Sequence, residues 1–365
     1  MRHLVLLMGM AATPLPAQQW IVGARPTLTI GTASDDARHQ FERIDDLLVL
    51  QDGRIVVLDS RVPAVRMYSA AGRWLRDLGR PGEGPGEYRE PIAIAVVPGG
   101  IGILDRGGRM ETVSLEGRPL RSARVPLVDI RDEKFTLLPV RPMADGTALM
   151  RAQQRVFGEV QGEFRQQVGL FRAAGGRVTD SLGWFADDSG RTDRMGTPVP
   201  RPYLPATGLL MATAGNRVAV ITADKPRITV LDLAGRRVAQ WNVPAQAGTV
   251  RPADLDRVRK LTLRGFSGNE LRVVREWEMG RPVLGRAPAA ANILLSAARP
   301  GEVWVERWGR ANGRARWQVF RESGALIGEV EMPPGLELMA VGSDYIVGVI
   351  RDADDVETVV RHALR

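Results

Sequence analysis

The chain has 365 residues, enough for one large domain or two ordinary ones, and it can bury a sizeable core without covalent staples. It contains no cysteine, which excludes disulfides, thiolate metal sites and a lipidated N-terminal cysteine. The formal net charge is +8. Of 50 basic residues three are lysines, which leaves 47 arginines. Because these arginines are scattered rather than gathered in a block, we interpret them as a solvated surface and expect no nucleic-acid partner.

The first 17 residues have the order of a secretory signal peptide. Arg2 and His3 make a short polar start, an apolar run follows from Leu4 to Ala12, and Thr13 to Ala17 is rich in small residues and proline. The apolar run is too short to span a bilayer, and no later stretch is long enough. We therefore expect a signal peptide over residues 1–17, a mature chain over 18–365, and export to the periplasm or the extracellular space without a transmembrane segment.

Six copies of one hairpin follow from about residue 40 onward. In each copy an apolar run meets a tight turn, and a second strand-forming run leaves it. The turn residues are of the kind that supplies positive φ angles in β-hairpins. The turn dipeptides are Asp52-Gly53, Gly99-Gly100, Asp145-Gly146, Gly215-Asn216, Pro300-Gly301 and Ser343-Asp344. Six copies in order predict a repeat architecture.

A second hairpin follows the first five copies, so five units have four strands each. The sixth unit ends in a third strand, Glu357 to Leu364, and lacks a fourth. One extended segment, Thr27 to Gly31, is spare and can complete that sheet. A ring of stacked sheets leaves only short edges, whereas an open array needs caps. We predict an all-β, six-bladed β-propeller closed by the N-terminal strand; the alternative is a β-sandwich or several small β domains.

The joint between the first two units, GRPGEGPGEYREPIAIAV from Gly79 to Val96, resembles the NHL-repeat signature of a glycine-rich linker, an aromatic residue, proline and a strand. The run from Ile55 to Gly79 looks like an NHL-type blade, and the ending VGSDYIVGVIRDADDVETVVRHAL also fits this group. The chain is similar to exported bacterial six-bladed propeller proteins related to NHL proteins, over about residues 40–365. This resemblance implies the fold and little chemistry.

The repeat spacing widens in two places. Residues 184–205 are polar, proline-rich and aromatic at both ends, and we expect a long ordered loop there. Residues 245–291 predict a helical insertion between blades 4 and 5. Pro252 starts one helix, with Leu255, Val258 and Leu261 on one face, and Asn269 caps a second helix with Leu271, Val274 and Trp277. Each insertion follows the fourth strand of one blade and precedes the first strand of the next. Such connections all lie on one face of a propeller, so both insertions should lie over the same end of the channel.

Long loops on a rigid scaffold often carry binding sites, although these two could equally fill a groove. Aromatic side chains offer stacking surfaces and arginines offer contacts to anions. The candidate ligand-binding residues are Trp184, Phe185, Arg191, Arg201, Tyr203 and Trp277. We therefore expect a monomeric binding module for a peptide, glycan or protein partner, without a cofactor.

Catalytic chemistry has less support in the sequence. His39 and His362 fall away from the channel openings, which disfavours a catalytic triad or a histidine-ligated metal, and we assign no catalytic residue. The alternative is an ion-dependent hydrolase or lyase, similar to propeller lactonases, with Ca²⁺ held at the channel mouth. Arg151 and Arg307 would interrupt such a carboxylate ring. The weak candidate metal ligands are Asp59, Asp105, Asp224 and Asp352, although aspartate at a strand end usually forms a turn.

Overall fold

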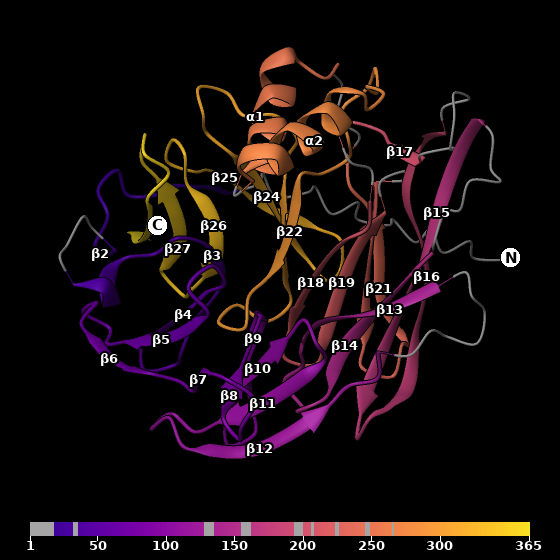
Figure 1. Cartoon of the computed structure of the whole chain (residues 1–365). Coiled ribbons are helices and arrows are strands. Elements are labelled where there is room, and N and C mark those ends of the chain that lie inside the picture. Colours follow the sequence, from indigo (N-terminus) through magenta and orange to yellow (C-terminus); the bar gives the residue numbers. More distant parts are fainter. Residues whose placement is uncertain are drawn as a thin grey trace, which may run out of the picture.

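The structure is a computed structural model, and it describes residues 18–31, 36–127, 135–154, 162–192, 200–205, 208–222, 226–244, 249–264 and 266–365. In these residues, six sheets of four or five strands stand around one axis, and two helices cover one end of the ring (Figure 1). The six-bladed all-β propeller with a small helical insertion is confirmed. The expected signal peptide lies outside the described residues.

Each blade is built on an antiparallel meander whose first strand lies nearest the axis, and blade 5 adds the parallel strand β1 at its outer edge. Blade 1 consists of β3 (Ile44–Val49), β4 (Ile55–Asp59), β5 (Ala64–Tyr68) and β6 (Trp74–Asp77). The linker strands β7 (Arg80–Pro81) and β8 (Glu87–Tyr88) follow. Blade 2 consists of β9 (Pro91–Val97), β10 (Gly100–Asp105), β11 (Arg109–Val113) and β12 (Pro119–Arg124). Blade 3 consists of β13 (Phe135–Pro142), β14 (Ala148–Gln154), β15 (Gly162–Ala174), β16 (Arg177–Thr192) and β17 (Pro200–Pro202).

The second half of the chain completes the ring. Blade 4 consists of β18 (Leu210–Ala214), β19 (Arg217–Thr222), β20 (Arg227–Asp232) and β21 (Arg237–Asn242). The helices α1 (Pro252–Leu263) and α2 (Gly268–Met279) come next. Blade 5 consists of β22 (Asn292–Leu295), β23 (Glu302–Glu306), β24 (Arg316–Arg321), β25 (Leu326–Glu331) and β1 (Gln18–Trp20). Blade 6 consists of β26 (Glu337–Val341), β27 (Tyr345–Arg351), β28 (Glu357–Ala363) and β2 (Leu28–Ile30).

Six apolar clusters, one between each pair of neighbouring blades, hold the ring together. The middle strands are buried on both faces, which explains why they read as continuous apolar runs rather than alternating ones. In β4, for example, Ile55 to Asp59 are all buried, whereas Leu75 to Asp77 of the outer strand β6 are exposed. Burial of apolar area stabilises a fold by about 25 cal/mol per Å², and this stabilisation is concentrated between the blades.

The six predicted turns all join the first and second strands of a blade. Five of them contain a glycine with positive φ, as expected, and the sixth does not. Gly53, Gly99, Gly146, Gly215 and Gly301 have positive φ. The expectation of a positive φ is wrong for the sixth turn, because neither Ser343 nor Asp344 adopts one. The hydroxyl of Ser343 instead donates to Asp344 Oδ1 at 3.1 Å, so local side-chain bonding accompanies this turn.

Ring closure uses two N-terminal strands rather than one. The predicted strand is β2, which pairs antiparallel with β28, and Thr27 Oγ1 donates to Arg361 O at 3.1 Å. The second strand, β1, was not expected; it runs parallel to β25 on blade 5. Trp20 packs against Trp304 in a tilted arrangement with a centroid separation of 5.2 Å, and the Arg299 guanidinium lies 4.7 Å from the Trp20 ring. The N-terminal segment therefore bridges blades 5 and 6.

The glycine-rich joint is a packed structural element. The Tyr88 hydroxyl, buried between blades 1 and 2, accepts a hydrogen bond from Val65 N at 3.0 Å. Gly86 N donates to the buried carboxylate of Glu111 at 2.9 Å. A Cβ at Gly86 would lie 2.9 Å from the Pro119 side chain, and its φ of +76° is unfavourable for other residues. The motif therefore locks blade 1 onto blade 2.

Two expectations about the insertions need correction. Residues 184–192 belong to the long strand β16, which pairs with β15 as far as Gly162↔Thr192, because register shifts let the polar segment stay in the sheet. The helices form as expected, with Pro252 in the first turn of α1, but α2 begins at Gly268 after Ser267, so Asn269 is not its N-cap. Among the described residues, neither helix has the length and apolar content needed to cross a membrane.

Candidate functional site: the helix-covered end of the channel

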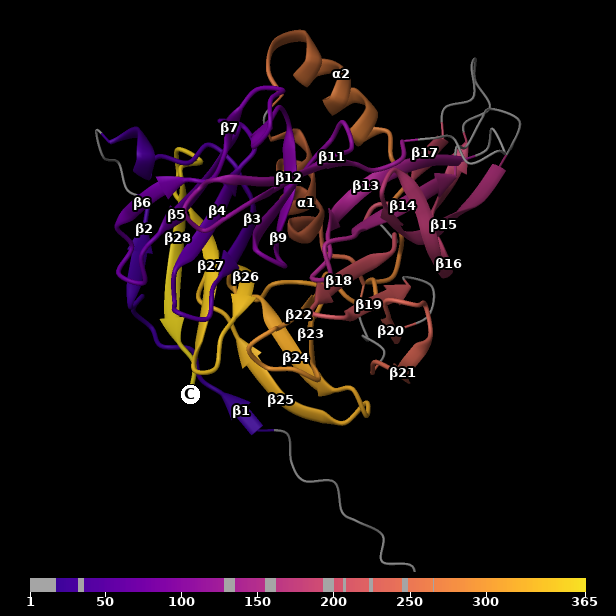
Figure 2. The ribbon, with the colours of Figure 1, turned by 90° about the horizontal axis from the view of Figure 1, so that it is seen from below.

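Helix α1 lies across one end of the central channel, where it is visible through the middle of the ring (Figure 2). At its start, Arg251 Nη2 donates to Arg310 O of blade 5 at 3.0 Å. Just after its end, Arg264 Nη2 donates to Glu42 O beside blade 1 at 3.3 Å. Val258, between these points, lines a pocket formed with blades 3 and 4. The helix therefore covers this opening of the central channel.

The two irregular segments of the chain meet on this face. Leu204 N donates to Pro282 O and Leu284 N donates to Leu204 O, each at 2.8 Å. Arg281 Nη2 donates to Tyr203 O at 2.8 Å, and Arg281 also pairs with the fully buried carboxylate of Glu278 at 3.0 Å. The expectation that both insertions occupy one face is confirmed by these contacts. Glu278 and Arg281 join the segments into a single lid.

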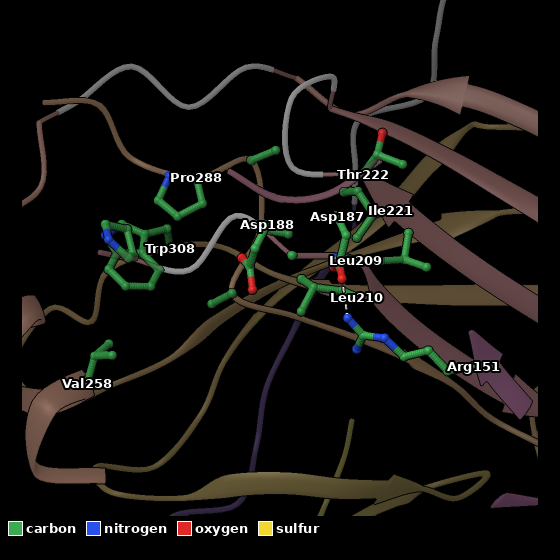
Figure 3. Close-up of a pocket in the computed structure, with 15 residues that line it drawn as sticks. Arg151, Asp187, Asp188, Leu209, Leu210, Ile221, Thr222, Val258, Pro288 and Trp308 are labelled. Atoms are coloured by element: carbon green, nitrogen blue, oxygen red, sulfur yellow. Dashed lines mark hydrogen bonds and ion pairs between the residues drawn. The ribbon is translucent and has the colours of Figure 1, made fainter. Parts of the chain in front are cut away.

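A small pocket of about 310 Å³ lies on one side of α1. Figure 3 shows Arg151 reaching Asp187 on one side of it, with Val258 and Trp308 on the other. Asp187 is fully buried; it pairs with Arg151 and accepts a hydrogen bond from Leu209 N at 2.8 Å. Most other lining residues are apolar. We call this cavity the apolar pocket, and its one deeply buried carboxylate is fully engaged.

A larger depression of about 770 Å³ lies between the two helices and blade 6. We call it the basic groove. Its cationic lining residues are Arg257, Arg259, Lys260, Arg264, Arg275 and Arg351. Its acidic lining residues are Asp256, Asp352 and Asp355. The lining thus carries more cations than carboxylates, and the volume of the groove is within the range of about 300–1,000 Å³ that is usual for ligand sites.

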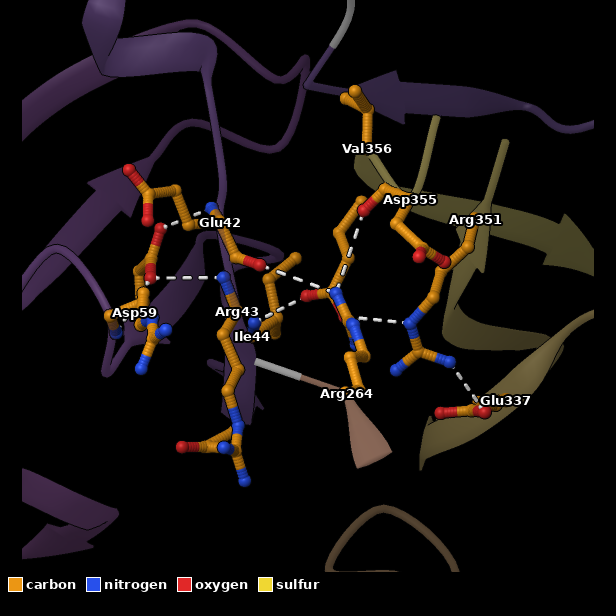
Figure 4. Close-up of polar contacts among 12 residues, drawn as sticks. Glu42, Arg43, Ile44, Asp59, Arg264, Glu337, Arg351, Asp355 and Val356 are labelled. Atoms are coloured by element: carbon orange, nitrogen blue, oxygen red, sulfur yellow. Dashed lines mark hydrogen bonds and ion pairs between the residues drawn. The ribbon is translucent and has the colours of Figure 1, made fainter. Parts of the chain in front are cut away.

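Two of the groove arginines are held by a buried carboxylate at the junction of blades 6 and 1 (Figure 4). Glu357 is fully buried; it accepts from Arg264 Nη1 at 2.5 Å, from Arg351 Nε at 2.8 Å and from Ile44 N. Arg351 Nη1 also reaches Glu337 at 2.6 Å. Arg264 and Arg351 are therefore structural cations, and Glu357 ties the ring closure to the end of α1.

Arg257 is in a different position. It is half-buried, its Nε is shielded from solvent, and it makes no hydrogen bond or ion pair with any described residue. Its guanidinium lies 6.0 Å from the Trp308 ring, and burial together with nearby Arg310 lowers its pKa. Burial also raises the pKa of the neighbouring Glu306, despite the ion pair with Arg310 at 3.2 Å. The charges of Glu306, Asp254 and Glu337 oppose the lowering of the Arg257 pKa, although none of these carboxylates forms an ion pair with Arg257.

Within the ring, charges on the innermost strands are also paired. Asp46 on β3 accepts from Arg141 Nη2 on β13 at 3.3 Å and from Ile94 N on β9 at 2.9 Å. Burial raises the pKa of Asp46, and the Arg141 charge opposes that shift. These contacts join the first strands of blades 1, 2 and 3.

The weak candidate metal ligands behave as turn formers wherever they are described. Asp59 accepts from four backbone N–H groups, those of Glu42, Arg43, Arg61 and Val62, at 2.9 to 3.2 Å. Asp105 accepts from Arg109 N at 2.9 Å, and Asp352 accepts from Asp354 N and Val356 N at 2.9 Å. Asp224 lies outside the described residues. In the described part of the chain, no three His, Asp or Glu side chains are grouped so as to hold a metal ion.

The predicted ligand-binding aromatics separate into two groups. Trp184 is 47% exposed and packs against Phe135 at 4.8 Å, away from both the pocket and the groove. Phe185 packs into the core between blades 3 and 4. Tyr203 and Trp277, by contrast, both contact Arg281, whose guanidinium lies 5.4 Å from the Trp277 ring. Only this second pair belongs to the lid.

The two predicted arginines lie on the long arm of blade 3. Arg191 on β16 is paired in register with Arg201 on β17, and the Arg191 side chain is exposed. Only the backbone of Arg201 is described. Nearby, the Tyr203 hydroxyl donates to Glu163 Oε1 at 3.0 Å. Burial, and to a smaller extent this hydrogen bond, raises the pKa of Tyr203. The structure thus brings Arg191, Arg201 and Tyr203 together.

Several residues of this end were missed because their roles depend on distant partners. Asp187, Arg257 and Glu357 carry no local sequence signal of burial. The pairs Arg251–Asp254 and Glu278–Arg281 have i,i+3 spacing on or next to a helix and could have been found that way. The interpretation of the arginines as solvated surface was incomplete, because many of them neutralise buried carboxylates.

Comparison with known proteins agrees with this architecture. Residues 36–135 match the model of a family described as a 6-bladed beta-propeller. A DUF4221 family member from Bacteroides vulgatus is 8% identical, with a TM-score of 0.56 over 95% of this chain and 99% of that chain. A Bacteroides fragilis protein thought to be exported is 12% identical, with a TM-score of 0.49 over 93% of each chain. The calcium-binding protein regucalcin from Agrobacterium tumefaciens is 12% identical, with a TM-score of 0.44 over 89% and 92%.

No curated protein sequence matches this chain. The family match and the first structural likeness agree with the resemblance to six-bladed propeller proteins related to NHL proteins. At such low identity the likeness shows the fold alone, so the function has to be argued from the helix-covered end itself.

Proposed function

We propose that this chain is an exported binding module that recognises a peptide, glycan or protein partner on its helix-covered face. One observation carries the proposal: beside α1, which lies over the channel mouth, the basic groove presents the exposed cations Lys260 and Arg275, which form no ion pair with any described residue. The well-buried carboxylates at this end, Asp187, Glu278 and Glu357, are each engaged by an arginine. The charged groups that remain available are therefore the groove cations, which are suited to holding a ligand rather than to acid–base catalysis.

Export is part of this proposal and rests on the order of residues 1–17, a polar start, an apolar run and a small-residue segment. A chain without cysteine is suited to an oxidising compartment because it has no thiol to mispair.

The alternative, an ion-dependent hydrolase or lyase at the channel mouth, has weaker support. A Ca²⁺ site needs six to eight oxygen ligands, of which several are usually carboxylates. Asp59, Asp105 and Asp352 are occupied by backbone N–H groups, and Arg151 stands at the corresponding level of blade 3. Calorimetric titration with Ca²⁺ separates the two functions. We expect no binding, whereas micromolar affinity that depends on these aspartates would favour the enzyme.

Capture of a partner from envelope extract tests the binding module. The double substitution Arg191→Ala and Arg201→Ala alters the arm on the helix-covered face, and surface ion pairs contribute only about 0–1 kcal/mol, so the fold should persist. We expect capture to weaken at least tenfold, about 1.4 kcal/mol. The matched control changes Arg73 and Arg118, both exposed in turns of the opposite face, to alanine. Loss of capture in the control alone would move the site to the opposite face.

A further inference from the structure

We propose that the basic groove binds an acidic peptide segment that also carries apolar side chains, with Arg257 as its central anchor. This inference rests on the proposed function and names the ligand class of the same face. It follows from which charges of the groove have partners, which apolar side chains lie among them, and how the two helices frame the depression.

Arginines on this face that have a structural role have carboxylate partners. Arg264, Arg281 and Arg351 each contact a fully buried carboxylate at 3.0 Å or less. The groove departs from that pattern. Among the described residues, Arg257, Lys260 and Arg275 have neither a hydrogen bond nor an ion pair, and the one ion pair of Arg259, with Asp256, is 3.9 Å long. Glu306, Asp254 and Glu337 act on Arg257 only from beyond ion-pair distance, so these four cations lack a close carboxylate partner among the described residues.

The unpaired cations come from both helices, which indicates more than one anionic group on the ligand. Arg257, Arg259 and Lys260 belong to α1, and Arg275 belongs to α2. The acidic neighbour Asp352 forms no ion pair with these cations among the described residues; its Oδ1 accepts hydrogen bonds from the backbone N–H groups of Asp354 and Val356. Guanidinium groups bind carboxylates strongly through paired, charge-assisted hydrogen bonds, and clusters of them recognise acidic motifs.

Apolar side chains lie between these charges. Leu261 is 40% exposed, and Leu263, Phe266 and Leu271 line the same groove. A uniformly charged polymer would satisfy the cations and leave this apolar surface in water. A peptide that combines acidic and apolar residues removes the apolar area from water and neutralises the cations at the same time. Charge complementarity and the exposed leucine therefore favour such a peptide.

Arg257 is the anchor because its desolvation has already occurred. Its Nε is shielded from solvent, and the Trp308 ring lies beside the guanidinium. A ligand carboxylate that reaches Arg257 displaces less water from the guanidinium and interacts with it at a lower local dielectric. This contact should therefore contribute more to the binding free energy than contact with the exposed Lys260 or Arg275.

Fluorescence anisotropy of the full mature chain tests the inference. The probe is a short labelled peptide that alternates Glu and Leu, and its matched control alternates Gln and Leu. We expect binding of the acidic probe only, with affinity that falls as salt screens the charges. Arg257→Gln should raise the Kd at least tenfold. Arg121→Gln, an exposed change on blade 2, should leave the Kd unchanged.

A second variant guards against misfolding of Arg257→Gln. Lys260→Gln with Arg275→Gln changes two exposed side chains and should raise the Kd severalfold with an unchanged melting temperature. Equal affinity of the wild type and both groove variants would overturn the inference. Stronger binding of polyglutamate than of the Glu–Leu probe would overturn the apolar part, and binding of anionic vesicles without the peptide would overturn the ligand class. If the peptide fails while helix-face variants still lose capture from extract, the inference fails and the proposed function stands.

Discussion

Replacing Glu357 should destabilise the ring at its closure more than any surface charge change. The Glu357 carboxylate is fully buried and holds Arg264 after α1, Arg351 of blade 6 and the backbone of Ile44 in blade 1. Glu357→Gln keeps the shape but removes the negative charge, so two partly buried guanidinium groups lose their shared counter-charge. Breaking a buried ion pair by removing one partner costs about 3–5 kcal/mol. We expect a loss of that size.

Urea unfolding followed by tryptophan fluorescence measures this loss as a shift in the transition midpoint at constant slope. The matched control is Glu331→Gln, since Glu331 pairs with Arg314 at 3.6 Å and the two side chains are 48% and 42% exposed. An exposed pair of this kind contributes about 0–1 kcal/mol. If Glu357→Gln costs no more than Glu331→Gln, the buried junction does not hold the ring closed and the reasoning is refuted.

Three further predictions address the termini and the pH dependence. Deleting residues 18–32 should expose the edge of β28, so size-exclusion chromatography should show self-association and the melting temperature should fall; a monomer with unchanged melting would show that β1 and β2 are dispensable. Mass spectrometry of exported protein should find a mature N-terminus near Gln18, and an intact Met1 would contradict the leader assignment. Burial raises the pKa of Glu306 above its ordinary value of 4.5, so the folded state binds this proton more tightly than the unfolded state and stability should fall as pH rises through that window. Glu306→Gln should abolish that part of the pH dependence in unfolding titrations, and an unaltered profile would assign it to another group.

The fold could be predicted from the sequence because its information is local and repeated. Each hairpin can be recognised by a turn dipeptide between two apolar runs. Six copies together with one spare strand at Thr27 to Gly31 are consistent with a closed ring. The strand β1 was not predicted because Gln18 to Trp20 is too short to show a periodic pattern. Its position on blade 5 depends on packing against the distant Trp304. Residues 184–192 were misread because their polar composition suggests a loop, while pairing with β15 makes them a strand.

The candidate site could be placed on a face but not resolved into residues. Connection logic put both insertions at one end, and the contact of Leu204 with Pro282 agrees. Which charges are free is decided by long-range pairing, and the sequence separation of Arg264 and Glu357 is 93 residues. No spacing rule distinguishes Arg264, which pairs with a buried carboxylate, from Arg257, which forms no ion pair with any described residue. The choice of Trp184 and Phe185 as ligand contacts had a similar origin, since residue type gives no information on the side of the sheet that they occupy.

The pairing of β2 near the N-terminus with the last strand, β28, also governs how the molecule can fold. Each four-stranded blade can nucleate from neighbouring hairpins, but the contact of Thr27 with Arg361 spans 334 residues. Loop-closure entropy grows only logarithmically with length, by about 0.6 kcal/mol per doubling, so closing the circle is thermodynamically cheap. It is kinetically late, because contacts of such high order form slowly. Until then β28 remains an unpaired edge, and the nearly complete ring is the species most exposed to aggregation during folding.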